Sequence, residues 1–175
     1  MRCSRAQARK AILFSVAGWL LAAPAARAGQ PAAVAASAGG FSILRGTATF
    51  EAGCEAQFAP RRLRWLPSFV PGLSPTAGAM ATAKGTLYVY GGFRFDLPLG
   101  EGWEASPQFA TGFYHHGDDE RDLGGALEFR SGIELSRRLG ARSRLGLTFY
   151  HLSNAGLYTH NPGSESLVLT YSTRR

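Results

Sequence analysis

Two residues near the C-terminal end of this sequence, His151 and Ser153, have types and a spacing that could carry out chemistry. They end an alternating segment that is typical of a β-strand, and residues two apart on a strand point to the same face. A serine hydroxyl is a weak nucleophile at neutral pH, and a neighbouring imidazole can remove its proton. The pair therefore indicates acyl transfer with Ser153 as nucleophile and His151 as general base.

Glu165, at the start of the next expected strand, would complete a catalytic triad. A carboxylate beside the imidazole fixes its tautomer and stabilises its cation. Apolar residues share faces with these three polar ones, Leu145, Leu147 and Phe149 on the first strand and Leu167, Leu169 and Tyr171 on the second. Because consecutive strands usually pair, we expect His151, Ser153 and Glu165 to meet on one apolar, outward-facing wall.

A plainer interpretation of the same residues stays open. His-x-Ser occurs on β-strands by chance, and the Asn-Ala-Gly of 154–156 and the Asn-Pro-Gly of 161–163 are ordinary turn sequences. A glutamate at the head of a strand is commonly just a solvated end. Polar residues on a lipid-facing stripe are less ordinary, because they cost free energy away from the membrane interface.

Strands are the elements that would have to position these residues. Apolar and polar side chains alternate over 86–96 and 126–134, which is the period of a β-strand. In a soluble sandwich the apolar face would pack in a core, whereas in a membrane barrel it would meet lipid and the polar face would fill the lumen. Alternation alone leaves both architectures open.

The lengths of the connections favour the membrane barrel. Eight strands are expected, at 33–44, 46–58, 63–73, 85–97, 103–114, 125–137, 142–153 and 164–172. Short connections are expected at 59–60, 97–102 and 139–141, and long ones at 74–84, 115–124 and 154–163. Outer-membrane barrels have short periplasmic turns and longer outer loops. The predicted fold is therefore all-β, an eight-stranded antiparallel transmembrane β-barrel of the bacterial outer membrane.

A barrel of this size is narrow enough for side chains to fill its interior. Five charged residues on expected inward faces are predicted to pair there, Arg94, Asp96, Glu128, Arg130 and Glu134. Four aromatic residues near strand ends are interpreted as a girdle at the membrane interface, Trp65, Trp103, Tyr114 and Tyr150. If odd-numbered strands run outward from the periplasm, Ser153 lies near the external rim, at the depth of the lipid headgroups.

The N-terminal residues indicate export. Residues 1–28 are interpreted as a cleaved signal peptide, because basic residues precede an apolar run at 11–23 that is too short for a membrane helix and is followed by an Ala-x-Ala pattern. The mature domain is then 29–175. Loss of five basic residues and no acidic one lowers the formal charge from +7 to +2, so the high pI is no argument for nucleic-acid binding. Cys54 remains as a single cysteine, which leaves no intramolecular disulfide.

The segment from His115 to Asp122 contains histidines and carboxylates, which can ligate divalent cations. It shows no ligand-spacing pattern and is interpreted as a solvated outer loop, and cation binding there stays open. No metal or cofactor is predicted for the site, because serine-based acyl transfer needs neither.

Residues 151–157, His-Leu-Ser-Asn-Ala-Gly-Leu, resemble the signature of PagL-type lipid A 3-O-deacylases, a family also labelled acyloxyacyl hydrolase-like. Glu165 follows His151 at the interval of the family's triad acid, and the length and expected strand count are also similar. The resemblance implies Ser153 as nucleophile, His151 as general base and then acid, and Glu165 as the acid that orients the imidazole.

The resemblance also implies a reaction. An enzyme of this family would hydrolyse the 3-position acyl ester of lipid A in lipopolysaccharide and release a 3-hydroxy fatty acid. Asn154, with the Gly156 amide, would stabilise the tetrahedral oxyanion. The partners would be lipopolysaccharide and the lipids of the outer membrane. A homodimer stays open, because apolar outer faces do not distinguish lipid from a second barrel.

Two other functions compete with deacylation. One is a non-catalytic structural or adhesive outer-membrane barrel, in which the His-Ser pair is accidental. The other is a phospholipase-like esterase that uses the same three residues on glycerophospholipids. Loss of a hydroxyacyl mass from lipid A would favour deacylation, and production of lysophospholipid would favour the phospholipase.

Overall fold

The computed structural model describes residues 31–46, 48–64, 72–117 and 121–174. The leader predicted at 1–28 therefore lies outside the described residues. In the described ranges the chain forms the strands β1 (Ala33–Phe41), β2 (Thr49–Gln57), β3 (Ser74–Thr82), β4 (Leu87–Arg94), β5 (Leu97–Gly100), β6 (Trp103–His115), β7 (Leu127–Arg138), β8 (Ser143–Ser153) and β9 (Ser164–Arg174). None of these residues belongs to a helix long and apolar enough to cross a membrane.

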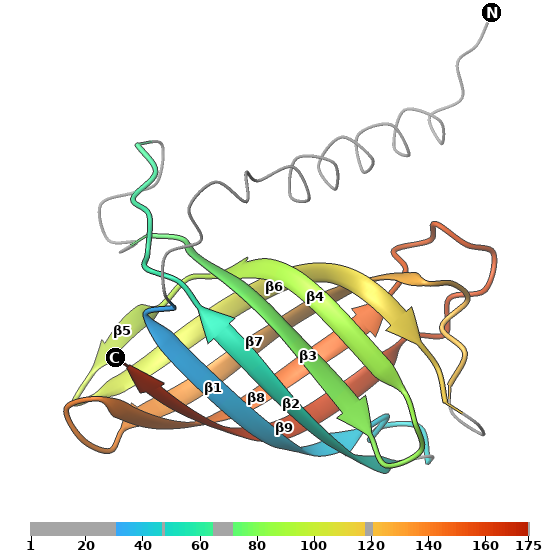
Figure 1. The fold of residues 1–175 in the computed structure, drawn as a ribbon, viewed down its shortest axis with the longest axis horizontal. Helices are drawn as coiled ribbons and strands as arrows, with labels where there is room; N and C mark the ends of the chain where they lie inside the picture. Colours follow the sequence, from blue (N-terminus) through green and yellow to red (C-terminus); the bar gives the residue numbers. More distant parts are fainter. Residues whose placement is uncertain (1–30, 47, 65–71, 118–120, 175) are drawn as a thin grey trace, which may run out of the picture.

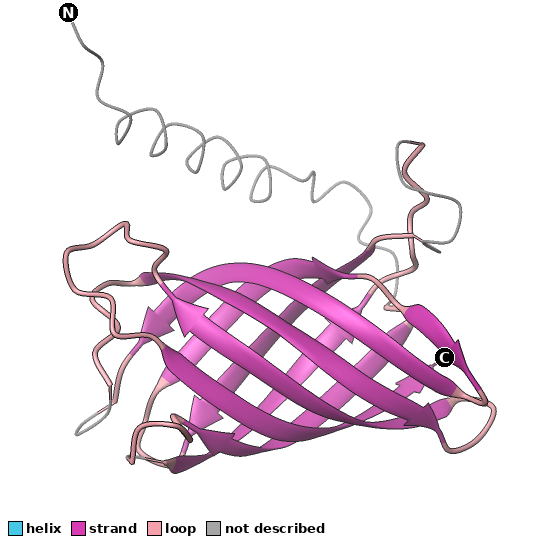
Figure 2. Ribbon diagram, turned by 180° about the vertical axis from the view of Figure 1, so that it is seen from behind, coloured by secondary structure: helices cyan, strands magenta, loops and turns pink. Residues whose placement is uncertain are grey.

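The strands form a closed antiparallel barrel (Figure 1 and Figure 2). Neighbouring barrel strands pair along the chain, β4 pairs with β6, and β1 pairs with β9, which closes the wall. β5 lies outside this circle and pairs with β6. The wall thus has eight strands, which confirms the predicted all-β, eight-stranded antiparallel barrel. Closure satisfies the backbone hydrogen-bonding groups of the wall, as crossing a bilayer requires.

The two ends of the barrel carry different connections. Ala33 pairs with Arg174, so β1 begins and β9 ends at the same end (Figure 1). The connections at that end are 58–73, 95–102 and 139–142, and those at the other end are 42–48, 83–86, 116–126 and 154–163. Because outer-membrane barrels keep their termini in the periplasm, we call the second end the outer rim. β8 runs toward the outer rim, and Ser153 is its last residue.

The prediction failed at the third strand. It placed a strand at 63–73 and a long loop at 74–84, whereas β3 is Ser74–Thr82 and only residues 83–86 join it to β4. The bulky apolar residues that suggested a strand precede β3, and most of them fall in 65–71, which lie outside the described residues. β3 itself carries small residues, so apolar bulk gave a misleading signal. The other seven predicted strands overlap observed ones, with ends that differ by at most three residues.

Charged side chains inside the barrel pair as predicted, with one exception. Arg94 lies 2.7 Å from Asp96 and 3.1 Å from Glu134. Glu128 is fully buried, but neither of its carboxylate oxygens has a hydrogen-bond partner among the described residues. The prediction that Glu128 joins the interior network is therefore wrong for the residues that the structure describes.

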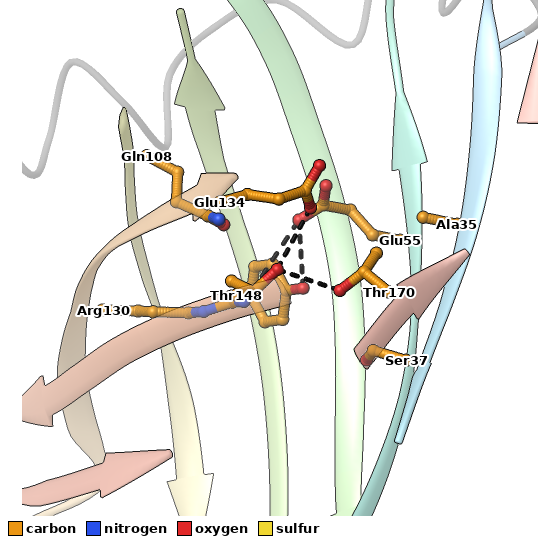
Figure 3. A pocket seen from close by; sticks show the side chains of 9 residues that line it. Ala35, Ser37, Glu55, Gln108, Arg130, Glu134, Thr148 and Thr170 are labelled. Carbon is orange, nitrogen blue, oxygen red and sulfur yellow. Dashed lines mark hydrogen bonds and ion pairs between the residues drawn. The ribbon is translucent and has the colours of Figure 1, made fainter. Parts of the chain in front are cut away.

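The rest of the interior is packed. The Arg130 guanidinium lies over the rings of Tyr90 and Tyr150, 4.8 and 4.0 Å from their centroids. Figure 3 shows Glu55 and Glu134 directed toward the same interior space, where the cavity is about 20 Å³, room for about one water molecule. The lumen is therefore a core of paired polar side chains and not an open channel.

Strand parity also corrects the predicted aromatic girdle. Tyr114 and Tyr150 are 5% and 2% exposed, respectively, because their positions on β6 and β8 face the interior. They cannot serve as interfacial residues on the outer wall. Trp103 is 39% exposed at the periplasmic end of β6, as a girdle residue would be, and Trp65 lies outside the described residues.

Candidate active site

β8 and β9 place the predicted triad at the outer rim. Their outward positions carry exposed apolar side chains, Leu145, Leu147 and Phe149 on β8 and Leu167, Leu169 and Tyr171 on β9. His151 and Glu165 continue these two rows and are register partners across the strands. They therefore lie side by side on the outside of the barrel, as the parity of the two strands predicted.

His151 and Glu165 are in contact. The His151 Nδ1 atom lies 3.2 Å from Glu165 Oε1, which is within hydrogen-bonding distance. The Glu165 side chain is 13% exposed and the His151 side chain 39%, so the carboxylate is shielded while the ring stays accessible. Because Nδ1 faces the carboxylate, Nε2 is the ring atom left to take a proton from a hydroxyl, as in a Ser-His-acid triad.

Two serine hydroxyls flank the His151 ring on the outer wall. Ser153 is two positions farther along β8, and Ser131 on β7 is the register partner of His151. Among the described contacts neither hydroxyl is hydrogen-bonded to the ring, and such bonds are often long until substrate binds. Ser131 lies within a strand whose backbone groups are used by the ladder, whereas Ser153 adjoins a loop with further donors. The surroundings favour Ser153 as the nucleophile.

Gly163 leaves the space that the His151 ring occupies. It is buried and has a φ of +65°, a conformation that other residues rarely adopt. A Cβ atom at this position would lie 2.6 Å from His151 Cε1 and 3.2 Å from Nε2. The Asn-Pro-Gly sequence suggested only a turn, but this glycine also lets the imidazole adopt its position beside Glu165.

Asn154 and Gly156 lie next to Ser153 in the chain, as predicted. Their N–H groups, which were expected to bind the oxyanion, instead donate hydrogen bonds to other groups of the loops. Asn154 is fully buried, and its Nδ2 donates to the carbonyl oxygens of Leu123 and His160, both at 2.7 Å. Its Oδ1 accepts a hydrogen bond from the Gly156 N–H at 2.9 Å. Both amide hydrogens of Asn154 and the Gly156 N–H therefore already have acceptors. In this arrangement Asn154 ties the β6–β7 loop to the β8–β9 loop.

Asn161 supplies a carboxamide next to the nucleophile. Its Oδ1 accepts a hydrogen bond from the backbone N–H of Asn154, the residue that follows Ser153, at 3.1 Å. Because that backbone group can only donate, the oxygen of Asn161 must face it, and this fixes which atom is Nδ2. Nδ2 has no hydrogen-bond partner among the described residues, and the residue is exposed. Sequence reasoning missed this donor because Asn before Pro-Gly is an ordinary turn residue.

Arg45 is a second residue that sequence reasoning missed. It lies in the β1–β2 connection, and its Nε is 3.7 Å from Glu165 Oε2. The closure of the barrel between β1 and β9 brings together two residues that are far apart in the sequence. The outer rim thus carries a row of cation, carboxylate, imidazole and hydroxyl, formed by Arg45, Glu165, His151 and Ser153.

The segment from His115 to Asp122 is described only in part, because residues 118–120 lie outside the described residues. The rings of His115 and His116 stack with centroids 6.0 Å apart. In the part of the chain that the structure describes, no three His, Cys, Asp or Glu side chains form a group that could hold a metal ion. Cation binding by this loop stays a prediction.

Comparisons with known proteins bear on the same region. The sequence model of a family described as "Lipid A 3-O-deacylase (PagL)" matches residues 48–174, which include His151, Ser153 and Glu165. A curated relative, "Lipid A deacylase PagL" of Bordetella bronchiseptica, is 35% identical over 81 residues. That match covers 46% of this chain and 42% of the relative, so less than half of the relative's length is matched.

Solved structures share the fold. The crystal structure of the outer membrane enzyme PagL superposes with a TM-score of 0.62 and 21% identity, covering 82% of this chain and all of the other. The crystal structure of Neisserial surface protein A gives a TM-score of 0.53 and 13% identity, with 82% of this chain and 96% of the other covered. At these identities the two likenesses speak for the barrel architecture alone.

Proposed function

Since this chain belongs to the lipid A 3-O-deacylase (PagL) family, we propose that it is a serine esterase that hydrolyses the 3-position acyl ester of lipid A in lipopolysaccharide. The product is a 3-hydroxy fatty acid. The observation that carries the proposal is the contact between His151 and Glu165 on the outer wall, two residues from Ser153. Residues 1–28 would act as a secretory signal peptide that is absent from the mature protein.

The mechanism follows from the order of these groups. Ser153 Oγ attacks the ester carbonyl carbon while His151 Nε2 takes the hydroxyl proton. Glu165 holds the ring through Nδ1 and stabilises the imidazolium. His151 then gives the proton to the departing sugar oxygen, which leaves an acyl-serine. Water, deprotonated by His151, attacks that ester and releases the fatty acid and Ser153.

Asn161 is the side chain that we assign to the oxyanion. Its Oδ1 is fixed by the Asn154 N–H, so Nδ2 is held beside the nucleophile, and no described residue accepts its hydrogens. A neutral amide donor directed at the developing negative charge stabilises the transition state more than the ground state. Asn154 and Gly156, the donors suggested by the sequence, act in this proposal by holding the loop in place.

The position of the site fits a lipid substrate. Exposed leucine and phenylalanine side chains surround the triad on the outer wall, so an acyl chain can approach from the bilayer. The triad itself lies at the outer rim, where polar residues cost little because headgroups and water are near. A lipid ester of the outer leaflet can therefore reach Ser153 laterally, without leaving the membrane.

The test is to express the full chain in a bacterium whose lipid A keeps its 3-position acyl chains. Mass spectrometry of extracted lipid A should show loss of one hydroxyacyl chain with the wild type and none with Ser153→Ala at equal outer-membrane abundance. Lysophospholipid without any change in lipid A would instead show a phospholipase. Unchanged lipids with both proteins would favour a non-catalytic barrel and overturn the proposal.

A further inference from the structure

The β1–β2 connection at the outer rim is fixed against the first residues of β9. Ser42 is 1% exposed and has a φ of +57°, so the chain turns sharply where β1 ends. The Ile43 N–H then donates to the carbonyl oxygen of Glu165 at 3.0 Å. This hydrogen bond places Arg45, two residues farther on, at the same edge as the triad acid.

The guanidinium of Arg45 has donors that no described residue accepts from. Of its nitrogens, Nε approaches Glu165 Oε2 at 3.7 Å, which is longer than a hydrogen bond. Among the described residues the side chain makes no other polar contact, and it is 43% exposed. The two terminal nitrogens form a planar pair that matches two oxygens of a phosphate group. They are therefore available to an anionic ligand.

The orientation of His151 by Glu165 does not require the charge of Arg45. Glu165 already orients His151 through Oε1, the oxygen that Arg45 does not approach. Arg45 Nε lies 3.7 Å from Glu165 Oε2, and Glu165 Oε1 lies 3.2 Å from His151 Nδ1, so the guanidinium is on the far side of Glu165 from the imidazole. A headgroup whose ester is at Ser153 can therefore extend along the outer rim to Arg45.

We propose that Arg45 binds a phosphate on the headgroup of the substrate, next to the reacting ester. The inference rests on the proposed esterase function and narrows it to acyl esters on a phosphorylated sugar. When the ester carbonyl lies at Ser153, a phosphate on the same sugar reaches the terminal nitrogens of Arg45 at the outer rim. Arg45 would then both position the ester and distinguish this headgroup from an uncharged one.

The experiment compares Arg45→Gln with the wild type on purified, phosphorylated lipid A and on the same lipid A after enzymatic removal of its phosphates. Both proteins are the full processed chain in detergent micelles, and the released fatty acid is quantified by mass spectrometry. Lys84→Gln is the matched control, because Lys84 is an exposed cation in another outer connection. On phosphorylated lipid A we expect Arg45→Gln to raise KM about tenfold with kcat nearly unchanged. On dephosphorylated lipid A it should behave like the wild type, and Arg45→Lys should recover part of the loss.

Three results would overturn the assignment. A fall in kcat of similar size on both lipids would show that Arg45 only positions Glu165. Equal KM values for Arg45→Gln and the wild type on phosphorylated lipid A would show that the guanidinium binds no phosphate. An equal rise of KM in Lys84→Gln would show that any exposed cation at the outer rim has the same effect. Failure of the esterase proposal looks different, because the wild type would then release no fatty acid from either lipid. A binding assay in the Ser153→Ala background, with and without Arg45→Gln, tests phosphate recognition even in that case.

Discussion

At the scale of single residues, the site depends on one carboxylate and one imidazole that strand register holds together. Glu165 is mostly shielded and directs its Oε1 at His151 Nδ1. In the proposed mechanism the charge of the carboxylate matters, because the imidazole would become a cation when it takes the serine proton. An amide of the same shape would keep a hydrogen bond but could not stabilise that cation.

Glu165→Gln should therefore lower kcat by about a hundredfold or more, with KM changed by less than about threefold. Steady-state rates on purified lipid A measure both constants. The barrel should stay folded as in the wild type, and resistance to unfolding in detergent at moderate temperature checks this. Wild-type kcat in this variant would show that Glu165 is not the triad acid.

Gly163→Ala should displace the His151 ring, because the new Cβ would lie 2.6 Å from Cε1 and the backbone has a positive φ. We expect kcat to fall at least about tenfold and the free energy of unfolding to fall by about 1 kcal/mol. Gly140→Ala is the matched control, since nothing lies within 4 Å of a Cβ there and it is also in a connection. Full activity in Gly163→Ala would contradict the proposed position of the ring.

The sequence predicted His151, Ser153 and Glu165 from spacing, parity and a motif, because these features are local to two consecutive strands. Asn161 and Arg45 could not be predicted in the same way. The role of Asn161 depends on a hydrogen bond inside a loop, and loop conformation has no simple periodicity. Arg45 reaches Glu165 only because β1 pairs with β9 when the barrel closes.

At the scale of elements, the β8–β9 connection carries two asparagines with different tasks. Asn154 is buried and holds two loops together through its side chain, whereas Asn161 is exposed and keeps Nδ2 free. The two side chains can therefore be separated by experiment.

Asn161→Ala should lower kcat by about a hundredfold, the usual cost of losing one oxyanion donor, with little change in thermal stability. Asn154→Ala should lower kcat and also destabilise the loop, by about 1 to 3 kcal/mol, because the buried carbonyl oxygen of Leu123 and the partly buried one of His160 lose their donor. Amide hydrogen exchange at Gly156 and thermal unfolding measure this second effect. Equal kcat values in Asn161→Ala and the wild type would show that Asn161 does not stabilise the oxyanion.

The third strand shows where element prediction fails. β3 carries alanine, glycine and threonine, and the apolar residues that imitate a strand lie before it. A barrel wall needs one face toward lipid and one toward the lumen, and small residues satisfy both without a strong alternation. The other seven predicted strands lie within three residues of observed ones at each end, and β1 is among them although its residues are also mostly small.

At the scale of the whole molecule, the interior stabilises the barrel and the exterior carries the chemistry. The interior holds ion pairs and the Arg130 guanidinium over tyrosine rings, and the cavity beside them, about 20 Å³, is too small for a lipid. The outward side chains of β8 and β9 between the periplasmic end and the rim are apolar up to His151 and Glu165. The proposed reaction on a lipid therefore takes place on the outer wall and needs no pocket in the interior.

Arg94→Ala should test the interior independently of catalysis. It removes a cation that is 2% exposed and leaves Glu134 and Asp96 without their partner, a change that costs about 3 to 5 kcal/mol. Arg138→Ala, at an exposed position, is the control and should change stability by less than about 0.5 kcal/mol. Urea unfolding in detergent compares them, and equal stabilities would contradict the role of the buried network.

In the proposed mechanism Ser153, and not a neighbouring hydroxyl, attacks the ester. Ser131 is the appropriate comparison because it is the register partner of His151 on the same outer wall. The most direct measurement is the initial rate of 3-hydroxy fatty acid release from purified lipid A by the wild type, Ser131→Ala and Ser153→Ala. We predict that Ser131→Ala keeps the wild-type rate within about twofold and that Ser153→Ala is at least about a thousandfold slower. A Ser153→Ala protein that still releases the fatty acid at a rate near that of the wild type would contradict the proposed role of Ser153 as nucleophile.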